Sequence, residues 1–372
     1  MPTKQYPFYL RSTVILLGLT LFVYAIFNLK SILVPLSIAL LIAVLLNPLV
    51  NRLQQWKIPP AWSIAIALLV AVIVIGGIGF FLSSQMAHFT EQLPLLKKKF
   101  AELSANLQQY IQRELGYSLQ KQNQMISEAE SGMKPLVGAT VGTVFGSLAL
   151  LFLLPVYTFL FLFYKKLILN FVFEVFAEEN TKEVSVIVQQ TKGAIQSYML
   201  GLLLEALAVA ALNTVALLLL GVDYALLLGV LGAILNVLPY IGGIIAIALP
   251  VLIATITKDG FQTQLGVIAA YLVIQFIDNH FLVPFIVSSK VKINALISII
   301  VVLLGGAVWG IAGMFLSIPF IGVLKIIFDR VDGLKPWGKL LGDEIPTRHK
   351  GQIGRIIRKP KKSVSEKISA AK

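Results

Sequence analysis

The chain has 372 residues, of which 57% are hydrophobic and only 13% are charged, and its formal net charge is +13. Ordinary soluble domains carry about 25% charged residues, so this composition excludes a soluble globular protein and indicates one embedded in lipid. The chain has no cysteine, which excludes disulfides, thiolate catalysis and cysteine-bound metals.

The first half of the chain contains four apolar stretches long enough to cross a bilayer. A transmembrane helix needs about 20 consecutive apolar residues. The first stretch is longer than the apolar region of a signal peptide and is followed at once by a second, so we interpret it as an uncleaved span. The four stretches cover residues 12–29, 31–50, 62–82 and 137–164.

An amphipathic insertion, residues 86–134, separates the third stretch from the fourth. Within residues 91–115, apolar side chains recur at spacings of three and four, with lysine, glutamine and arginine between them. This pattern predicts a helix outside the hydrocarbon. Two interpretations stay open: a helix that lies on the bilayer or on its own spans, and a helix that holds subunits together.

The second half contains four more apolar stretches, which brings the predicted number of spans to about eight. They cover residues 193–222, 224–257, 260–287 and 293–324. A second amphipathic segment, within residues 167–199, leads into the first of them, and we expect it to form a cytoplasmic helix in the membrane interface.

Two of these stretches are too long for one perpendicular helix. At 1.5 Å per residue, residues 224–257 would extend about 50 Å, against about 30 Å of hydrocarbon. Pro239 and the glycines after it can interrupt the first stretch, and a run of glycines between residues 305 and 313 can interrupt the second. Each is therefore predicted to be either a tilted span or a hairpin of half-helices.

The distribution of basic residues predicts the topology. Lys4, Arg11, Arg52, Lys57 and the pair at 165–166 flank apolar stretches, and basic residues of short loops tend to remain cytoplasmic. Both termini are then cytoplasmic. Residues 1–342 form the membrane domain, and residues 343–372 form a basic tail that we expect to be disordered and attracted to anionic lipid. This placement disfavours nucleic acid as a partner.

The sequence lacks the common catalytic and energy-coupling motifs. It contains no P-loop, no Ser/His/Asp set and no His-Glu-x-x-His motif, and its three histidines, His88, His280 and His349, are far apart. We therefore predict a protein that is not an enzyme and that uses no metal or cofactor.

Polar residues within the apolar stretches carry the remaining functional information. They are Glu205, Asn213, Asn236, Gln275 and the run Asp278-Asn279-His280. A charge at the bilayer centre costs about 2.5 to 3.5 kcal/mol, so a cavity or a partner must solvate these groups. For Glu205 and Asp278, a transport or proton-coupling role and a structural hydrogen bond between helices both stay open. Asn213 is more typical of a hydrogen bond between helices.

The interruption around Pro239 is the most informative local feature. Discontinuous helices in transporters bring unpaired backbone groups to the middle of the membrane, where these groups bind polar or ionic substrates. Asn236 and Tyr240 would then flank a polar site. The alternative is a proline kink with glycines that only serve packing.

Three segments carry a resemblance to a known family. They are Asn236-Val237-Leu238-Pro239-Tyr240-Ile241-Gly242, the stretch from Gln275 to Lys290 with Asp278-Asn279 and Pro284, and the glycine-rich stretch from Gly305 to Met314 with Trp309. Together they resemble the autoinducer-2 exporter family of bacterial membrane proteins, and the similarity covers nearly the whole chain.

The resemblance implies a protein of the bacterial cytoplasmic membrane that exports a small polar molecule as a homo-oligomer. It also implies sodium or lithium exchange for protons as an activity of some members. The chain departs from the family pattern at Gly243 and Ala295, where proline is common, and at Leu202 and Glu205, which interrupt the usual polar start of the fifth span. These departures leave the fold unaffected and bear on the substrate.

We therefore expect an all-α polytopic bundle with broken or re-entrant helices in its C-terminal third. Its expected function is secondary export of a small polar solute; the alternatives are a sodium or lithium/proton antiporter and a non-transporting envelope scaffold. The predicted binding or gating residues are Asn236, Pro239, Tyr240, Gly242, Gly243, Gln275, Asp278, Asn279, Pro284, Gly305, Gly306, Trp309 and Gly310. The predicted ion-coupling residues are Glu205 and Asp278.

Overall fold

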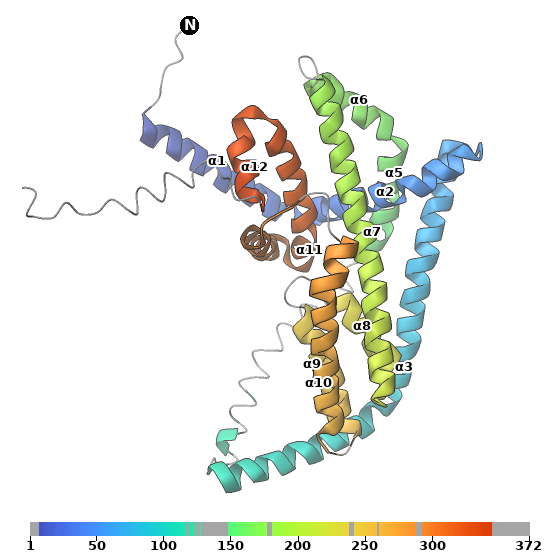
Figure 1. Cartoon of the computed structure of the whole chain (residues 1–372), viewed down its shortest axis with the longest axis vertical. Coiled ribbons are helices and arrows are strands. Elements are labelled where there is room, and N and C mark those ends of the chain that lie inside the picture. The colour runs from blue at the N-terminus through green and yellow to red at the C-terminus, as the bar shows by residue number, and fades with distance from the viewer. Residues whose placement is uncertain are drawn as a thin grey trace, which may run out of the picture.

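The computed structural model describes residues 7–116, 118, 120–122, 124, 127, 148–176, 181–237, 242–258, 260–287 and 292–343. These residues form helices and contain no β-strand, which confirms the predicted all-α fold (Figure 1).

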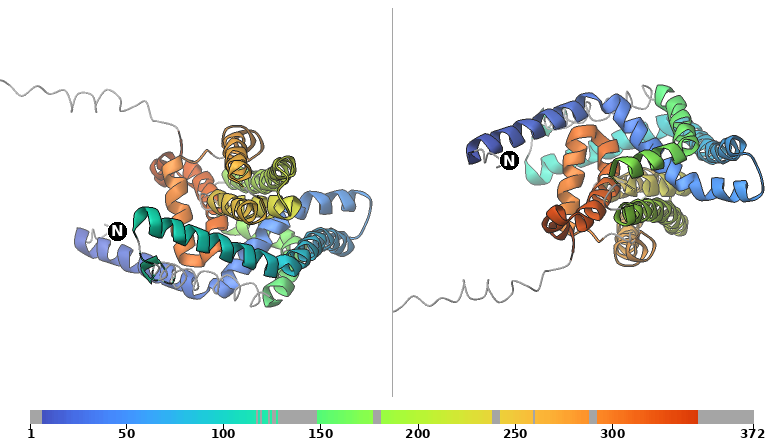
Figure 2. Two further views of the ribbon diagram at one scale, coloured as in Figure 1. Left: turned by 90° about the horizontal axis from the view of Figure 1, so that it is seen from below. Right: turned by 90° about the horizontal axis from the view of Figure 1, so that it is seen from above.

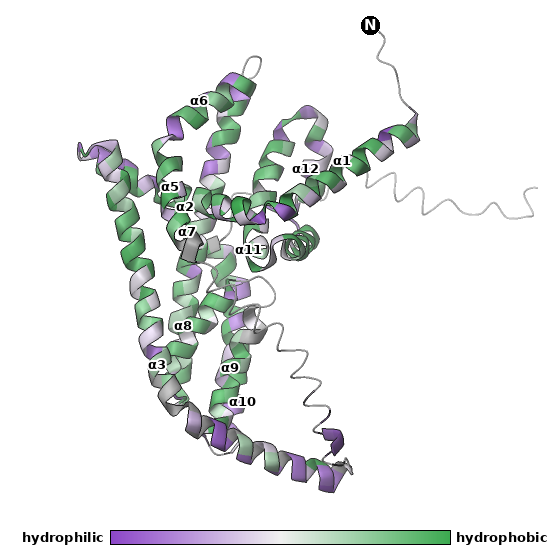
Figure 3. Ribbon diagram, turned by 180° about the vertical axis from the view of Figure 1, so that it is seen from behind, coloured by the Kyte–Doolittle hydropathy of each residue, from purple (hydrophilic) through white to green (hydrophobic). Residues whose placement is uncertain are grey.

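The first three helices follow the first three apolar stretches. They are α1 (Phe8–Asn28), α2 (Lys30–Gln55) and α3 (Pro60–Leu115). No residue of α1 is buried, as expected for an apolar helix that faces lipid. α3 continues without a break from the third stretch into the amphipathic segment, and its colouring changes from hydrophobic to hydrophilic along its length (Figure 3). Most of the insertion beyond residue 116 lies outside the described residues.

The next helices are α5 (Leu148–Phe163), α6 (Lys165–Phe176) and α7 (Thr181–Leu219). The chain bends by 61° between α5 and α6. The prediction gave residues 167–199 a helix of their own in the membrane interface; in the structure their second half is the beginning of α7. No proline interrupts α7, and Ile195, Tyr198 and Met199 are buried against α2 and α11. This packing keeps the segment in line with the fifth span.

The apolar stretch at residues 224–257 is a pair of short helices, α8 (Ala225–Asn236) and α9 (Gly242–Thr257), that pack against each other. Of the two predicted forms, the structure therefore shows the hairpin. α8 packs against both α7 and α9, and Figure 2 shows the helices from the two ends of the bundle. The approach of α8 to α7 requires Gly229, because a Cβ atom there would lie 2.7 Å from the backbone nitrogen of Thr214.

α10 (Gln262–Ile277) runs beside α7 and passes directly into a π-helical segment, η1 (Asp278–Val287). Segments of π-helix are rare and occur frequently at functional sites. Here the change of helix type begins at Asp278, one of the predicted site residues.

The last long helix, α11 (Ala295–Arg330), folds back on itself at Gly310, which has φ 62° and ψ −143°. Ser317 Oγ donates a hydrogen bond to the carbonyl oxygen of Val301 over 2.9 Å, although 16 residues separate them. A Cβ atom on Gly305 would lie 2.5 Å from the carbonyl oxygen of Gly313. The two limbs of α11 are therefore antiparallel and in backbone contact, which again selects the hairpin.

A short segment closes the described chain: η2 (Asp332–Leu334) and α12 (Lys335–Leu341). Asn294 joins it to the start of α11. Its side chain accepts from Ile297 N as an N-cap, and its Nδ2 donates to the carbonyl oxygens of Leu340 and Gly342.

By length and composition alone, six described helices could cross a membrane, or seven if α5 and α6 form one bent span; α11 enters this count as one helix although it folds back at Gly310. The predicted number of about eight is thus approximate. The difference arises at residues 224–257, where α8 and α9 are each too short to pass this test. The chain is an integral membrane protein whose helices leave large apolar faces for lipid (Figure 3).

Candidate functional site

Five polar side chains from α7, α8, α10 and η1 approach one another inside the bundle, and we call them the polar cluster. The most buried are Asn213 and Asp278, each 2% exposed, and Glu205, 7% exposed. Asn236, at the end of α8, and Gln275, near the end of α10, complete it. All five were singled out by the sequence because polar groups at such positions need solvation.

Asp278 is the centre of the polar cluster. Asn236 Nδ2 donates to Asp278 Oδ2 over 2.8 Å, and Gln275 Nε2 donates to the same oxygen over 3.4 Å. The other oxygen, Oδ1, is buried and has no hydrogen-bond partner among the described residues. Because a carboxylate can accept several hydrogen bonds, Asp278 is held in place through one oxygen and has its second oxygen available.

The interrupted helix reaches the same place. α9 begins at Gly242, and a Cβ atom on Gly243 would lie 2.9 Å from Gln275 Oε1 and 3.8 Å from Asn236 Oδ1. The first turn of a helix has backbone N–H groups without helical partners and a partial positive charge. The structure thus brings the start of α9 beside the polar cluster. Pro239 and Tyr240 lie outside the described residues.

Tyr271 and Gly232 also belong here, and the sequence analysis missed both. A cavity of about 10 Å³ is lined by Asn213, Gly232, Asn236, Tyr271, Gln275 and Asp278, together with apolar side chains. Such a volume suits about one water molecule. Tyr271 has a buried hydroxyl without a partner among the described residues. Its position four residues before Gln275, on the same helix face, was the signal that could have identified it.

Glu205 adds a second carboxyl group. It lies on the same face of α7 as Val209 and Asn213, and α7 packs against η1, the segment that carries Asp278. Neither carboxyl group forms an ion pair with a described lysine or arginine. Two buried acidic groups without a basic partner can share a proton or hold a cation.

The remaining predicted residues lie elsewhere. Asn279 and Pro284 are exposed on η1. Gly305, Gly306 and Gly310 belong to the α11 hairpin, where the first two bring one limb against the other. The sequence predicted these glycines to be binding or gating residues. In the structure the glycines of this segment pack the two limbs of α11 together.

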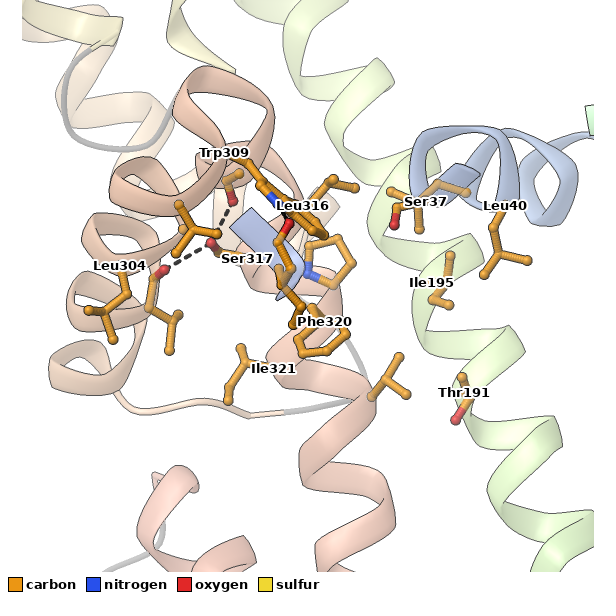
Figure 4. A pocket seen from close by; sticks show the side chains of 18 residues that line it. Ser37, Leu40, Thr191, Ile195, Leu304, Trp309, Leu316, Ser317, Phe320 and Ile321 are labelled. Carbon is orange, nitrogen blue, oxygen red and sulfur yellow. Dashed lines mark hydrogen bonds between the residues drawn. The ribbon is translucent and has the colours of Figure 1, made fainter. Parts of the chain in front are cut away.

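Trp309 lines a larger pocket of about 470 Å³ between α11, α7, α2 and α1 (Figure 4). Its indole Nε1 donates to the carbonyl oxygen of Ile26 over 3.0 Å. The other polar side chains of this pocket are Ser37, Thr191 and Ser317, and the rest of its lining is apolar. A polar solute finds few hydrogen-bonding groups here, so the polar cluster is the better candidate site.

Replacing Tyr271 by phenylalanine distinguishes a binding role of its hydroxyl from mere burial. Removing an unpaired buried hydroxyl should leave the stability within about 1 kcal/mol of the wild type. If the hydroxyl binds the transported species, the KM for transport should rise about tenfold, which corresponds to about 1.4 kcal/mol. Thermal unfolding in detergent and transport in vesicles measure the two effects, and an unchanged KM would remove Tyr271 from the site.

The chain is similar to a family of transporters over most of its length. The model of the family described as AI-2E family transporter matches residues 13–333. The AI-2 transport protein TqsA of Escherichia coli (strain K12) is 25% identical over 312 residues, which cover 84% of this chain and 90% of that protein. The "Putative transport protein YrrI" of Bacillus subtilis (strain 168) is 25% identical over 308 residues, which cover 80% of this chain and 86% of that protein.

Proposed function

Since the chain belongs to the AI-2E family of membrane transporters, we propose that it is a secondary transporter that exports a small polar solute past the polar cluster. The observation that carries the proposal is Asp278, which two amides hold through one oxygen while its other oxygen is buried without a partner. A solute hydroxyl or a bound water can donate to that oxygen.

The surroundings of Asp278 support a carrier. The short helix α8 ends beside it, and the short helix α9 begins beside it. Many secondary transporters bind substrate at a polar site of this kind, formed where helices are interrupted. The cavity beside Asp278 has a volume of about 10 Å³, too small for a solute larger than water, so a solute reaches Asp278 only if the surrounding helices move apart. The similarity to TqsA, whose name states AI-2 transport, supports a polar solute of comparable kind.

Exchange of sodium or lithium for protons is the second candidate, and the presence of a second buried carboxyl group, Glu205, on the helix that packs against the segment of Asp278 favours it. Two carboxyl groups can bind a cation when ionised and release it when protonated. The double variant Glu205→Gln, Asp278→Asn tests this candidate. An antiporter should lose proton-coupled cation flux in vesicles, whereas unchanged flux would exclude this mechanism.

We place the protein in the bacterial cytoplasmic membrane with both termini in the cytoplasm, because basic residues flank the ends of several apolar stretches. We also propose a homo-oligomer, on the resemblance to the family alone.

The proposed function is tested by comparing the small polar solutes that accumulate in cells with and without the protein. An exporter should lower the intracellular amount of its solute, and the purified protein in vesicles should then move that solute. If the purified protein moves no solute or cation but consistently captures other envelope proteins, the scaffold function is correct and the transport proposal is wrong.

A further inference from the structure

A second set of polar and charged groups lies where α2, α6 and α7 meet, and we call it the lysine corner: Asn47, Asn51, Lys165, Lys166 and Lys192. Lys165 Nζ donates to Asn47 Oδ1 over 2.8 Å and to Asn51 Oδ1 over 3.4 Å. Asn47 is 3% exposed, and the two asparagines are one turn apart on α2. The ammonium group is therefore fixed in one place by neutral acceptors.

The lysine corner has an excess of positive charge. Lys166 and Lys192 are close enough to repel the Lys165 ammonium, and none of the three forms an ion pair with a described carboxylate. An ammonium group has three N–H donors, and the asparagines take two. Asn47 Nδ2 is also a donor without a described acceptor. Donors and positive charge thus converge without an ion-paired carboxylate among the described residues, and Lys166 and Lys192 are exposed, so that an anion can approach them.

The surroundings of the lysine corner are those of a membrane–water interface. Trp56 and Trp62, at the α2–α3 connection just beyond Asn51, are 67% and 68% exposed, and Tyr164 directly precedes Lys165. Such aromatic side chains concentrate at the level of lipid headgroups. α6 exposes large apolar side chains, among them Phe171 and Phe176. An anion at the lysine corner would therefore lie between two lipid-accessible surfaces, the aromatic side chains of the α2–α3 connection and the apolar side chains of α6.

We propose that the lysine corner binds the phosphate group of an anionic phospholipid, whose acyl chains lie along the exposed apolar side chains of α5 and α6. The bound headgroup joins α6 and α7, which otherwise meet here with like charges, beside the asparagines of α2. The lysine corner shares only α7 with the polar cluster, and Lys192 is 13 residues from Glu205, about 20 Å along that helix. The site is thus separate from the proposed transport site.

The test compares phosphatidylglycerol with phosphatidylcholine of the same acyl chains, added to the detergent-purified full chain. Native mass spectrometry measures bound lipid and thermal unfolding measures stabilisation. We expect the wild type to prefer phosphatidylglycerol. Lys165→Gln and, separately, the exposed Lys192→Gln should each lower the affinity for it about fivefold, because one lysine near an anionic surface contributes about 1 kcal/mol. Lys339→Gln, on exposed α12, is the matched control and should bind as the wild type does.

The other outcomes overturn the proposal. Equal binding of the two lipids, or an equal loss in Lys339→Gln, would show that the lysine corner is no specific site. Stabilisation by inorganic phosphate at millimolar concentration without a preference for phosphatidylglycerol would assign the lysine corner to a soluble phosphate compound. If Lys165→Gln fails to fold, the exposed Lys192→Gln alone decides between these results.

Discussion

Replacing Asp278 by asparagine should lower solute flux in vesicles about 10- to 100-fold. Asparagine has nearly the same shape, but it lacks the negative charge that strengthens the hydrogen bonds from Asn236, from Gln275 and from a bound solute. Hydrogen bonds to charged groups contribute about 1.5 to 3 kcal/mol, which corresponds to this range. Initial rates of uptake into vesicles, measured at equal amounts of reconstituted protein, give the effect.

Asp223→Asn is the control for this experiment. Asp223 undergoes the same chemical change but is half exposed, between α7 and α8, and lies 3.7 Å from Lys258. Its loss should leave the flux unchanged, because pairs between exposed charges contribute little. Equal flux in Asp278→Asn and Asp223→Asn would mean that Asp278 only holds helices together.

Replacing Gly313 by alanine should destabilise the protein by about 3 kcal/mol or more. The new Cβ atom would overlap the carbonyl group of Gly305 and would lie 2.9 Å from Trp309 Cβ. The backbone of the opposite limb cannot move aside as a flexible side chain can, so the two limbs of the α11 hairpin must separate. Overpacking costs about 1 to 3 kcal/mol even where the neighbouring atoms can shift. The midpoint of thermal unfolding in detergent should fall.

Gly322→Ala provides the comparison within α11. Gly322 is buried, but a Cβ atom there would meet nothing within 4 Å. Alanine is favoured over glycine in a helix by about 1 kcal/mol, so this variant should be as stable as the wild type or more stable. If the two alanine variants unfold at the same temperature, the limbs of α11 are not in contact as the structure shows.

Much of the fold could be predicted from the sequence because a bilayer imposes a length and a polarity on each span. Each of the eight predicted apolar regions is mostly helical where the structure describes it. The excess length of residues 224–257 and 293–324 correctly indicated something other than two perpendicular spans. The choice between tilt and hairpin could not be predicted, because both forms satisfy the same composition.

The α11 hairpin shows why glycine patterns are ambiguous. Gly305, Gly306 and Gly313 permit close approach of another helix, but small side chains do not identify that helix. The partner proved to be the other limb of α11, and it depends on the backbone of one residue, Gly310, at positive φ. Glycine adopts this conformation readily, and a sequence cannot show which of several glycines does so.

Part of the candidate site could be predicted from the sequence, and the rest depended on the fold. Glu205, Asn236, Gln275 and Asp278 stand out because each is polar within an apolar stretch. Their convergence depends on the register of α7 against α8 and α10, which only the fold defines. Tyr271 was missed because tyrosine in an apolar helix is common at membrane interfaces, and only its buried, unpaired hydroxyl distinguishes it.

The central claim, that solute and water reach the polar cluster, is tested most directly by the reactivity of a single cysteine. The natural chain has no cysteine, so Gln275→Cys carries the only thiol, and Leu272→Cys, on an exposed apolar face of α10, is the lipid-facing control. A water-soluble, membrane-impermeant thiol reagent should modify Gln275→Cys and leave Leu272→Cys unmodified, and transported solute should slow the reaction. A thiol at position 275 that is as unreactive as the one at position 272 would contradict the account.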